Sequence, residues 1–213
     1  MYLAASKEKI LTLFFDDPAR EIHQREISRL AKVPPHNVNK YLKEFVKDEL
    51  LIKREISNMT FFKVNPQSDY LFKIFEIFEV LRRKKFLSNN KKIARLLTKY
   101  TDNLLHLSNR EVQMVLLFGS VARGQWTKGS DIDILTVTSI KDNQKKVIKV
   151  HEDAERDVSY LLKIEPVNVI VDKFVDGVRK KLEFYDEIWR DRIVLYNELL
   201  FWQLIKEAKF YHV

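Results

Sequence analysis

Cysteine is absent from this chain of 213 residues, and glycine and proline are scarce, with four and five residues. A chain without cysteine has no disulfide framework and no thiolate metal site. No long segment rich in glycine, serine or proline is present, so we expect no flexible linker. The longest apolar runs have five to six residues, too short to cross a membrane, and the N-terminus lacks the regions of a signal peptide. We therefore expect a cytoplasmic protein without a membrane partner.

The length and the hydrophobic fraction of 46% are sufficient for one or two domains with real cores. The net charge of +8 is unevenly distributed. Residues 1–66 carry 12 lysines and arginines against 9 acidic residues, residues 67–110 carry 10 against 4, and residues 111–213 carry 16 against 17. A basic N-terminal half indicates a polyanionic partner more than an acidic substrate.

A glycine-serine pair, followed after ten residues by two aspartates, is the most informative feature of the chain. Gly119 and Ser120 follow one short apolar run, and Asp131 and Asp133 open another. Side chains alternate faces along a strand, so the two aspartates are expected to point the same way. Two carboxylates on one face of an apolar strand repel each other unless a cation lies between them. Such oxygen ligands suit Mg²⁺ or Mn²⁺, which also take substrate phosphates.

The residues around the glycine-serine pair favour a phosphate. Gly119 allows the backbone to approach a phosphate closely, and Ser120 begins a helix whose first N–H groups favour anions. Arg123 and Lys128 lie in the same loop, within reach of phosphate oxygens. Together these residues predict a site for a metal-bound triphosphate.

At these residues the sequence resembles the minimal nucleotidyltransferases of the DNA polymerase beta superfamily. Their signature is Gly-Ser, ten residues and Asp-x-Asp, usually with Ala-Arg-Gly after the first pair and a serine, here Ser130, before the first aspartate. The resemblance implies that Asp131 and Asp133 are the catalytic and metal-binding residues. It also implies transfer of a nucleoside monophosphate, expected to be AMP, from a Mg²⁺-bound NTP, expected to be ATP, to a hydroxyl acceptor.

The third carboxylate of this superfamily is not evident in the sequence. It usually lies on a neighbouring strand, where it binds metal or deprotonates the attacking hydroxyl. The corresponding strand is expected at 167–171, and its centre is Asn168, an amide that cannot act as a base. Glu165 precedes this strand and Asp172 follows it, so either is a candidate substitute; by alternation Asp172 shares a face with Asn168. Catalytic activity therefore stays open.

The order of predicted elements in the first 66 residues resembles a winged helix-turn-helix DNA-binding domain. An apolar stripe predicts a first helix, a short helix is expected at 26–31, and Pro35 is well placed in the first turn of a third at 36–50. Residues 51–55 and 60–64 indicate a β-hairpin. A recognition helix presents its first polar residues to base edges in the major groove. The predicted DNA-binding residues are His36, Asn37, Asn39, Lys40, Lys43 and Arg54.

Residues 67–110 are predicted to form a helical connector that is interrupted at 88–90. We interpret the basic residues at 82–85 and 91–92 as a solvated face, with contact to the DNA backbone as the alternative. Further helices are expected at 144–162 and 198–208, and a last strand at 193–196. The predicted fold class is α+β with two domains. These are the winged helix-turn-helix at 1–66 and, after the connector, a nucleotidyltransferase α/β fold with a small mixed sheet at 111–213.

Three functions remain open. The first is a nucleotidyltransferase coupled to a DNA-binding winged helix. The second is a DNA-binding transcriptional regulator whose degenerate nucleotidyltransferase domain senses nucleotide, and Asn168 favours it. The third, implied by the resemblance, is an antitoxin that adenylylates a HEPN-type RNase toxin. A homodimer is compatible with all three.

Overall fold

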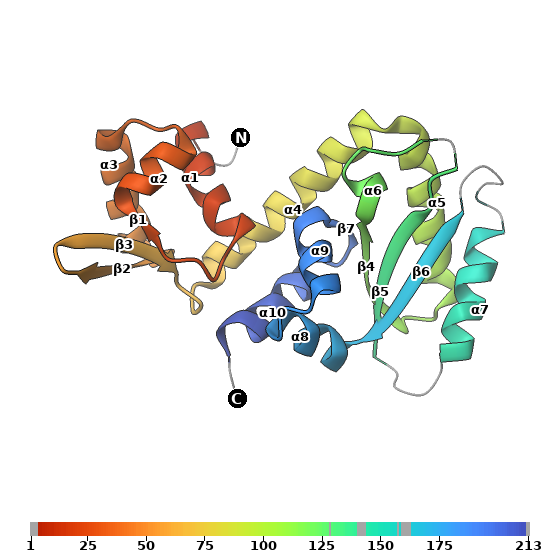
Figure 1. Ribbon diagram of the computed structural model, residues 1–213. Helices are drawn as coiled ribbons and strands as arrows, with labels where there is room; N and C mark the ends of the chain where they lie inside the picture. The colour runs from red at the N-terminus through yellow and green to blue at the C-terminus, as the bar shows by residue number, and fades with distance from the viewer. Residues whose placement is uncertain (1–3, 128, 140–143, 157, 159–162, 212–213) are drawn as a thin grey trace. The chain divides into compact units, whose positions relative to one another are not determined.

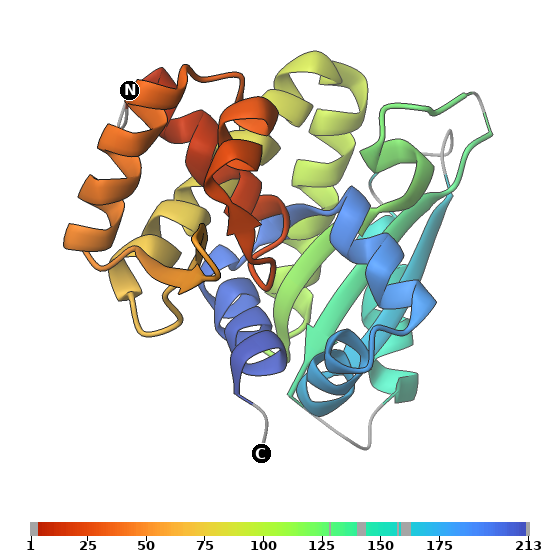
Figure 2. The same ribbon diagram turned by 60° about the vertical axis from the view of Figure 1, so that its left-hand side comes forward.

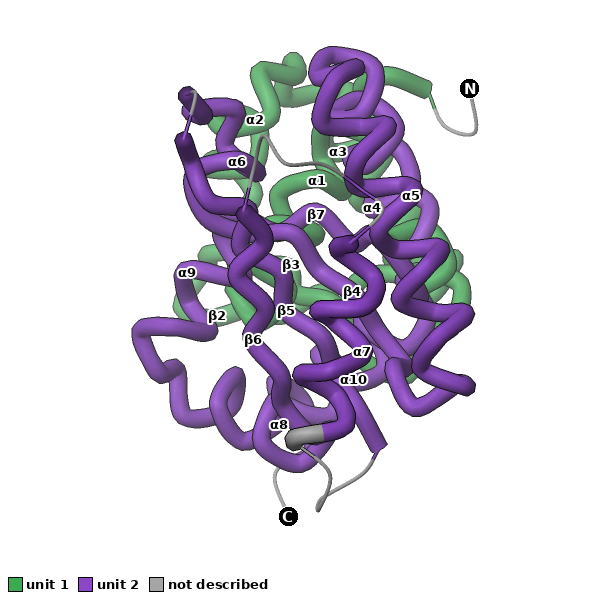
Figure 3. Tube along the Cα trace, turned by 90° about the vertical axis from the view of Figure 1, so that its right-hand side faces the viewer, with its two compact units in different colours: residues 1–75 green, residues 76–213 purple. Residues whose placement is uncertain are grey.

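The computed structural model describes residues 4–211 except 128, 140–143, 157 and 159–162. It divides into two compact units, Met1–Phe75 and Glu76–Val213, which are coloured green and purple in Figure 3. Each unit has its own β-sheet. The three-part division of the sequence at residues 66 and 110 stays a prediction. None of the helices in the described ranges is long and apolar enough to cross a membrane.

Unit 1 combines helices with a three-stranded antiparallel sheet of order β1-β3-β2 (Figure 1). Its elements are α1 (Ala5–Asp16), β1 (Ile22–His23), α2 (Gln24–Ala31), α3 (Pro35–Lys47), β2 (Leu51–Ile56) and β3 (Met59–Val64). The predicted helices and hairpin are present. Strand β1 is not predicted by the sequence, because two residues are too few to show an alternating pattern.

Local sequence explains how the elements of unit 1 begin and end. Helix α2 ends at Lys32, which has a left-handed backbone and donates its N–H to the Ser28 carbonyl. Pro35 occupies the first turn of α3, where the N–H that it lacks would have no helical partner. The hairpin turns through Ser57 and Asn58, whose φ angles of 44° and 65° are typical of a tight two-residue turn. The side chains buried between the helices are Ile10, Leu11, Phe14, Phe15, Ile27, Ala31, Val38, Leu42 and Phe45.

Unit 2 is built on a mixed four-stranded sheet of order β6-β5-β4-β7, in which β5 and β6 are parallel and β4 is antiparallel to both β5 and β7. The boundary between the units falls within α4 (Asp69–Asn89). The remaining elements are α5 (Lys91–Leu107), β4 (Val112–Phe118), α6 (Gly119–Ala122), β5 (Ile132–Thr138), α7 (Gln144–Glu155), β6 (Ile164–Ile170), α8 (Val171–Arg179), α9 (Glu183–Asp191), β7 (Ile193–Tyr196) and α10 (Glu198–Phe210). The mixed sheet and the α+β class agree with the sequence-based expectation.

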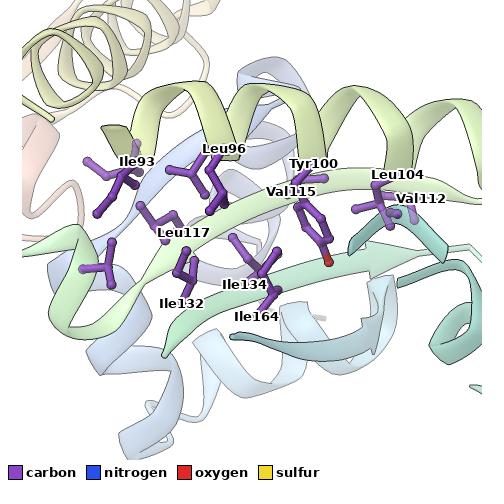
Figure 4. Close-up of a cluster of buried hydrophobic side chains, with 14 of the residues drawn as sticks. Ile93, Leu96, Tyr100, Leu104, Val112, Val115, Leu117, Ile132, Ile134 and Ile164 are labelled. Atoms are coloured by element: carbon purple, nitrogen blue, oxygen red, sulfur yellow. The ribbon is translucent and has the colours of Figure 1, made fainter. Parts of the chain in front are cut away.

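The strand register determines which side chains lie on each face of this sheet. Leu117 pairs with Ile134 on one face, and the next pair, Phe118 with Asp133, lies on the other. The first face packs against α5 and α7. Each fully buried Leu or Ile side chain there stabilises the fold by about 1.5–3 kcal/mol relative to an exposed one. Figure 4 shows this layer, with Ile93, Leu96, Tyr100 and Leu104 of α5 above Val115, Leu117, Ile134 and Ile164.

Three elements of unit 2 depart from the sequence-based expectation. Strand β6 begins at Ile164, three residues before the predicted start. Pro166 lies inside this strand and lacks a backbone N–H, but β6 is an edge strand, where proline is tolerated. Helix α7 ends at Glu155, and residues 157 and 159–162 of the helix predicted at 144–162 lie outside the described residues. Helix α9 (Glu183–Asp191) is not predicted at all. The first and last departures both change the candidate site.

A buried ion pair joins the second half of α4 to the end of α9. Arg192 is 2% exposed and donates from Nε to Glu79 Oε1 at 2.7 Å, while its guanidinium lies over the Trp189 ring at 3.9 Å from the centroid. Arg83 donates to the carbonyls of Val194 and Leu195 at 3.0 and 2.8 Å. Removing one partner of such a buried pair typically costs about 3–5 kcal/mol. These contacts hold the end of α4 against β7.

Candidate functional site

The glycine-serine pair and the two aspartates meet at one end of the unit 2 sheet. Strand β4 ends at Phe118 and runs antiparallel to β5, so Phe118 pairs with Asp133. Gly119 follows Phe118 directly, and Asp131 immediately precedes β5. Antiparallel pairing therefore brings together the two parts of the motif that ten residues separate in the sequence.

Gly119 lies directly against the Asp133 carboxylate. Its φ is +72°, and a Cβ atom at this position would lie 2.2 Å from Asp133 Oδ2. Two independent reasons therefore exclude a side chain here: the left-handed backbone conformation and the space that the carboxylate occupies. The sequence assigns this glycine to close approach of a phosphate, and the structure adds the aspartate as its immediate neighbour.

The half-buried carboxyl of Asp133 is in an environment that disfavours its charge. Burial is the main cause that raises the pKa of Asp133, and the negative charge of Asp131 raises the pKa further. Glu187 and Glu165 act in the same direction, and Arg123 opposes them. A divalent cation relieves this kind of repulsion, so the carboxylate oxygens gathered here fit Mg²⁺ or Mn²⁺. Among the residues that the structure describes, no three His, Cys, Asp or Glu side chains are close enough to form a metal site of their own.

Arg123, predicted to reach phosphate oxygens, is held by α9. Its Nη1 donates to the buried carboxylate of Asp191 and lies 3.7 Å from Glu187 Oε1. Its Nε donates to Gln125 Oε1 at 3.1 Å. Because α9 is not apparent in the sequence, neither of these acidic partners is predicted. Arg123 therefore anchors the loop after α6 and partly neutralises the acids near Asp133.

Two further hydrogen bonds hold the loop after α6 in place. The N–H of Thr127 donates to Ser130 Oγ at 2.8 Å, so the predicted nucleotide-binding serine also closes the turn before Asp131. Trp126 donates from Nε1 to Asn90 Oδ1 at 3.3 Å, which fastens the loop to the junction of α4 and α5. Ser120 is partly buried in the single turn of α6. Lys128 lies outside the described residues.

The register of β5 and β6 decides which side chain of β6 faces the aspartates. Asp133 pairs with Glu165, and Thr136 pairs with Asn168. Positions three apart on a strand point to opposite faces, so Glu165 shares a face with Asp133, and Asn168 does not. Of the candidate third-acid positions on β6, Glu165 therefore lies on the Asp133 face of the sheet and Asn168 on the opposite face. Asp172 lies in the first turn of α8, beyond the end of β6, so strand alternation does not govern its direction.

Asn168 belongs to a buried polar network on the α5–α7 face. Its Oδ1 accepts hydrogen bonds from Thr136 Oγ1 and from His151 Nε2, the latter at 2.8 Å. The Tyr100 hydroxyl lies within hydrogen-bond distance of His151 Nδ1, which is consistent with a neutral imidazole that carries its proton on Nε2. Burial lowers the pKa of His151, and the bond to Asn168 partly opposes this shift. No local pattern in the sequence indicates this network.

In unit 1, the predicted DNA-binding residues lie on α3 and β2. Asn37 is half-buried. Arg54 is exposed, and its Nη1 lies 3.6 Å from Glu21 Oε2. The exposed residues on the outer side of α3, all polar or basic, are His36, Asn39, Lys40, Lys43 and Lys47. In the described part of the chain, Lys40 and Lys43 form no ion pair.

A family model for the nucleotidyltransferase domain matches residues 97–210, slightly more than half of the chain. The chain therefore belongs to the nucleotidyltransferase domain family of the DNA polymerase beta superfamily, as its Gly-Ser and Asp-x-Asp motif predicts. No curated protein and no solved structure matches the chain significantly. Membership implies an NTP substrate, and this family typically uses a divalent metal. The match does not extend to residues 1–96, so the winged helix-turn-helix remains a proposal.

We predict that Asp133→Asn raises the thermal unfolding midpoint of the metal-free protein at neutral pH. A carboxyl whose folded-state pKa is raised stabilises the fold below its ordinary pKa of 3.8 and loses that contribution as pH rises through the folded value. The amide removes this cost. The same variant should lose Mg²⁺-dependent NTP binding in isothermal titration. Asp102→Asn, exposed on α5, is the control that should change neither, and a lower midpoint for Asp133→Asn than for wild type would contradict the assignment.

We also predict that His151 makes the fold less stable in mild acid. Because the pKa of His151 is lowered in the folded state, the unfolded chain binds the proton first as pH falls below 6.5. The free energy of unfolding should therefore decrease below that pH until the folded-state pKa is reached. In urea denaturation at several pH values, His151→Gln should flatten this part of the profile, and the exposed His106→Gln should leave it intact. Identical slopes for the two variants would refute the prediction.

Proposed function

We propose that the chain transfers a nucleoside monophosphate, with ATP as the expected donor, to a hydroxyl acceptor. The observation that carries this proposal is the half-buried Asp133 carboxylate, which lies against Gly119. Burial and nearby carboxylates raise the pKa of Asp133. A protein keeps such a costly group where a cation or a reaction needs it. Membership of the nucleotidyltransferase domain family supports the same reaction.

Each residue of the site has a role in this reaction. Asp131 and Asp133 would hold Mg²⁺ or Mn²⁺, which when bound neutralises charge on the triphosphate. Gly119 and Ser120 begin α6, and Ser130 lies in the loop that follows it. The sequence motif predicts that these residues contact the nucleotide, and Lys128 belongs to the same predicted set. Arg123 acts through its ion pair with Asp191, so we propose that it positions the loop.

Glu165 is the carboxylate that we propose as the general base. It pairs in register with Asp133 and shares its face of the sheet, and Lys163 donates a hydrogen bond to it. The acceptor oxygen would form a bond to the α-phosphorus while its proton passes to Glu165. The bond from that phosphorus to the oxygen bridging to the β-phosphate breaks, and pyrophosphate leaves.

The transfer reaction is tested by Glu165→Gln, measured as pyrophosphate release in the presence of Mg²⁺ and each NTP with an acceptor. General-base assistance is typically worth about 10²–10⁴-fold in rate, so we expect a loss of that order with little change in NTP affinity. Asn168→Asp should not raise the rate, because Asn168 bonds to His151 on the opposite face of the sheet. A rate increase in Asn168→Asp with no loss in Glu165→Gln would reverse the two assignments.

The nucleotide-sensing regulator has less support than the enzyme. The sequence favours it because Asn168 cannot act as a base. The register of β5 and β6 supports Glu165 as a candidate base instead, because it lies on the same face of the sheet as Asp133. Adenylylation of a HEPN-type toxin rests on the family resemblance alone. We therefore retain both as alternatives to the transferase.

We propose in addition that unit 1 binds DNA through α3. The order of its helices and hairpin resembles a winged helix-turn-helix, and the outer side of α3 is basic. Lys40 and Lys43 would contact phosphates, while Asn39 lies where an asparagine can pair with adenine. The half-buried Asn37 is less accessible for such contacts, and the exposed Arg54 lies 3.6 Å from the Glu21 carboxylate.

Duplex binding by the full chain tests this second proposal. We expect Lys40→Ala to weaken binding to all sequences alike and to reduce the dependence of log K on log salt by about 0.9. Asn39→Ala should instead relax the sequence preference. Lys9→Ala, an exposed lysine of α1, is the control. Retention of duplex by Lys40→Ala at wild-type strength and wild-type salt dependence would leave unit 1 as a protein-contact module.

A further inference from the structure

We propose that the acceptor is a single strand of nucleic acid, held by a basic corner where α4 ends and α5 begins. The basic corner consists of Lys84, Lys85, Lys91, Lys92 and Arg95. This inference rests on the proposed transfer reaction and names the class of its acceptor. It adds a binding surface that lies outside the sequence motif.

The segment that forms the corner carries charge of one sign only. Residues 80–101 contain eight lysines and arginines and no aspartate or glutamate. A solvated helix face usually mixes both signs, because Glu–Lys pairs three or four residues apart stabilise a helix by about 0.2–0.5 kcal/mol and like charges destabilise it similarly. Lys91 and Arg95 are such a like-charged pair, four residues apart. The fold thus tolerates repulsion here, which indicates an anionic partner.

The five cations of the corner are available to such a partner. All five side chains are exposed, and none of them forms an ion pair with any carboxylate in the described ranges. Arg83 in the same run behaves differently, since it is partly buried and bonds to Glu198 and to two carbonyls of β7. Arg83 thus serves the fold, whereas the five cations of the corner face solvent.

A hydrogen bond joins the residue between α4 and α5 to the loop of the candidate active site. Trp126, in the loop that leads to Asp131, donates to Asn90 Oδ1, and Asn90 donates from Nδ2 to the carbonyl of Phe86 at 2.9 Å. Asn90 is the residue between α4 and α5. Figures 1 and 2 show the end of α4 and the start of α5 at the same end of the sheet as α6. A strand bound where α4 ends and α5 begins would therefore pass beside the loop that leads to Asp131.

The candidate site is acidic, whereas the basic corner is positively charged. Carboxylates around Asp133 repel a polyanion, so an anionic acceptor needs a separate surface to attract it. Lysine supplies four of the five cations, and point charges on flexible stems suit phosphates independently of sequence. An acidic protein partner is a poorer match, because the buried centres of protein interfaces are depleted in lysine.

On such an acceptor, the proposed reaction extends the strand by one nucleotide. The terminal hydroxyl oxygen of the strand bonds to the α-phosphorus of the NTP, the bond from that phosphorus to the bridging oxygen breaks, and pyrophosphate leaves. The hydroxyl proton passes to Glu165. The strand becomes one nucleotide longer and carries one more phosphodiester charge.

The test compares two pairs of adjacent, exposed lysines in the full chain. Among the residues that the structure describes, only the control pair includes a lysine near a carboxylate, Lys180 at 3.8 Å from Asp176. Lys91→Gln/Lys92→Gln removes two charges from the corner, and Lys180→Gln/Lys181→Gln removes two exposed charges at the end of α8. Binding of a labelled single-stranded RNA and of a DNA of the same sequence is followed by fluorescence anisotropy at several salt concentrations. A second series carries Lys40→Ala/Lys43→Ala, so that binding by α3 does not mask the corner.

We expect the corner variant to bind the strand more weakly and to lower the slope of log K against log salt by about 1.4, since each contact to a single strand contributes about 0.7. Its KM for the strand should rise several-fold during incorporation of α-labelled nucleotide, with Mg–ATP binding unchanged. The control pair should alter neither. Whichever of RNA and DNA is extended identifies the acceptor.

Three outcomes would overturn the inference. The two lysine pairs could behave alike, wild type could bind Mg–ATP and extend no strand, or poly-glutamate could displace the strand as well as unlabelled strand of equal charge does. The second outcome leaves the nucleotidyltransferase proposal intact with another acceptor, and the third favours an acidic protein. Absence of Mg–ATP binding in wild type would instead remove the proposed function itself.

Discussion

The antiparallel pairing of β4 with β5 is the constraint on which the candidate site depends. It sets Phe118 opposite Asp133, so that the next residue, Gly119, has to pass directly over the aspartate carboxylate. This position requires both a positive φ and the absence of a side chain, and glycine meets both requirements. A register slip of one residue would turn Asp133 toward the apolar layer beneath α5, where an unpaired carboxylate is strongly disfavoured.

The loop between the two parts of the motif is anchored from outside the motif. Arg123 is bound by Asp191 of α9, and Trp126 is bound by Asn90 between α4 and α5. A loop ordered before its ligand arrives loses less conformational entropy on binding. The helices around the sheet thus contribute to the site although none of them carries the two aspartates.

Charge is separated within the chain. The site gathers carboxylates around Asp133, whereas exposed cations gather on the outer side of α3 and on the basic corner. An acidic site attracts a metal ion and repels phosphates, so a polyanion is attracted only where basic surface accompanies it. The net charge of +8 is therefore the sum of an acidic site that attracts cations and basic surfaces that attract anions.

The sequence by itself determined the family, the helices with clear apolar stripes, the strands β4 and β5, and Asp131 and Asp133 as neighbours, because these depend on local patterns. It indicated the break between α4 and α5 near Asn90 for the same reason. Only the tertiary structure decided that Glu165, and not Asn168, lies on the same face of the sheet as Asp133. Pro166 makes the start of β6 look unlike a strand in the sequence. The proline is tolerated because β6 is an edge strand, which only the strand order of the sheet shows. Register and pairing join residues far apart in the chain, and no local pattern encodes them.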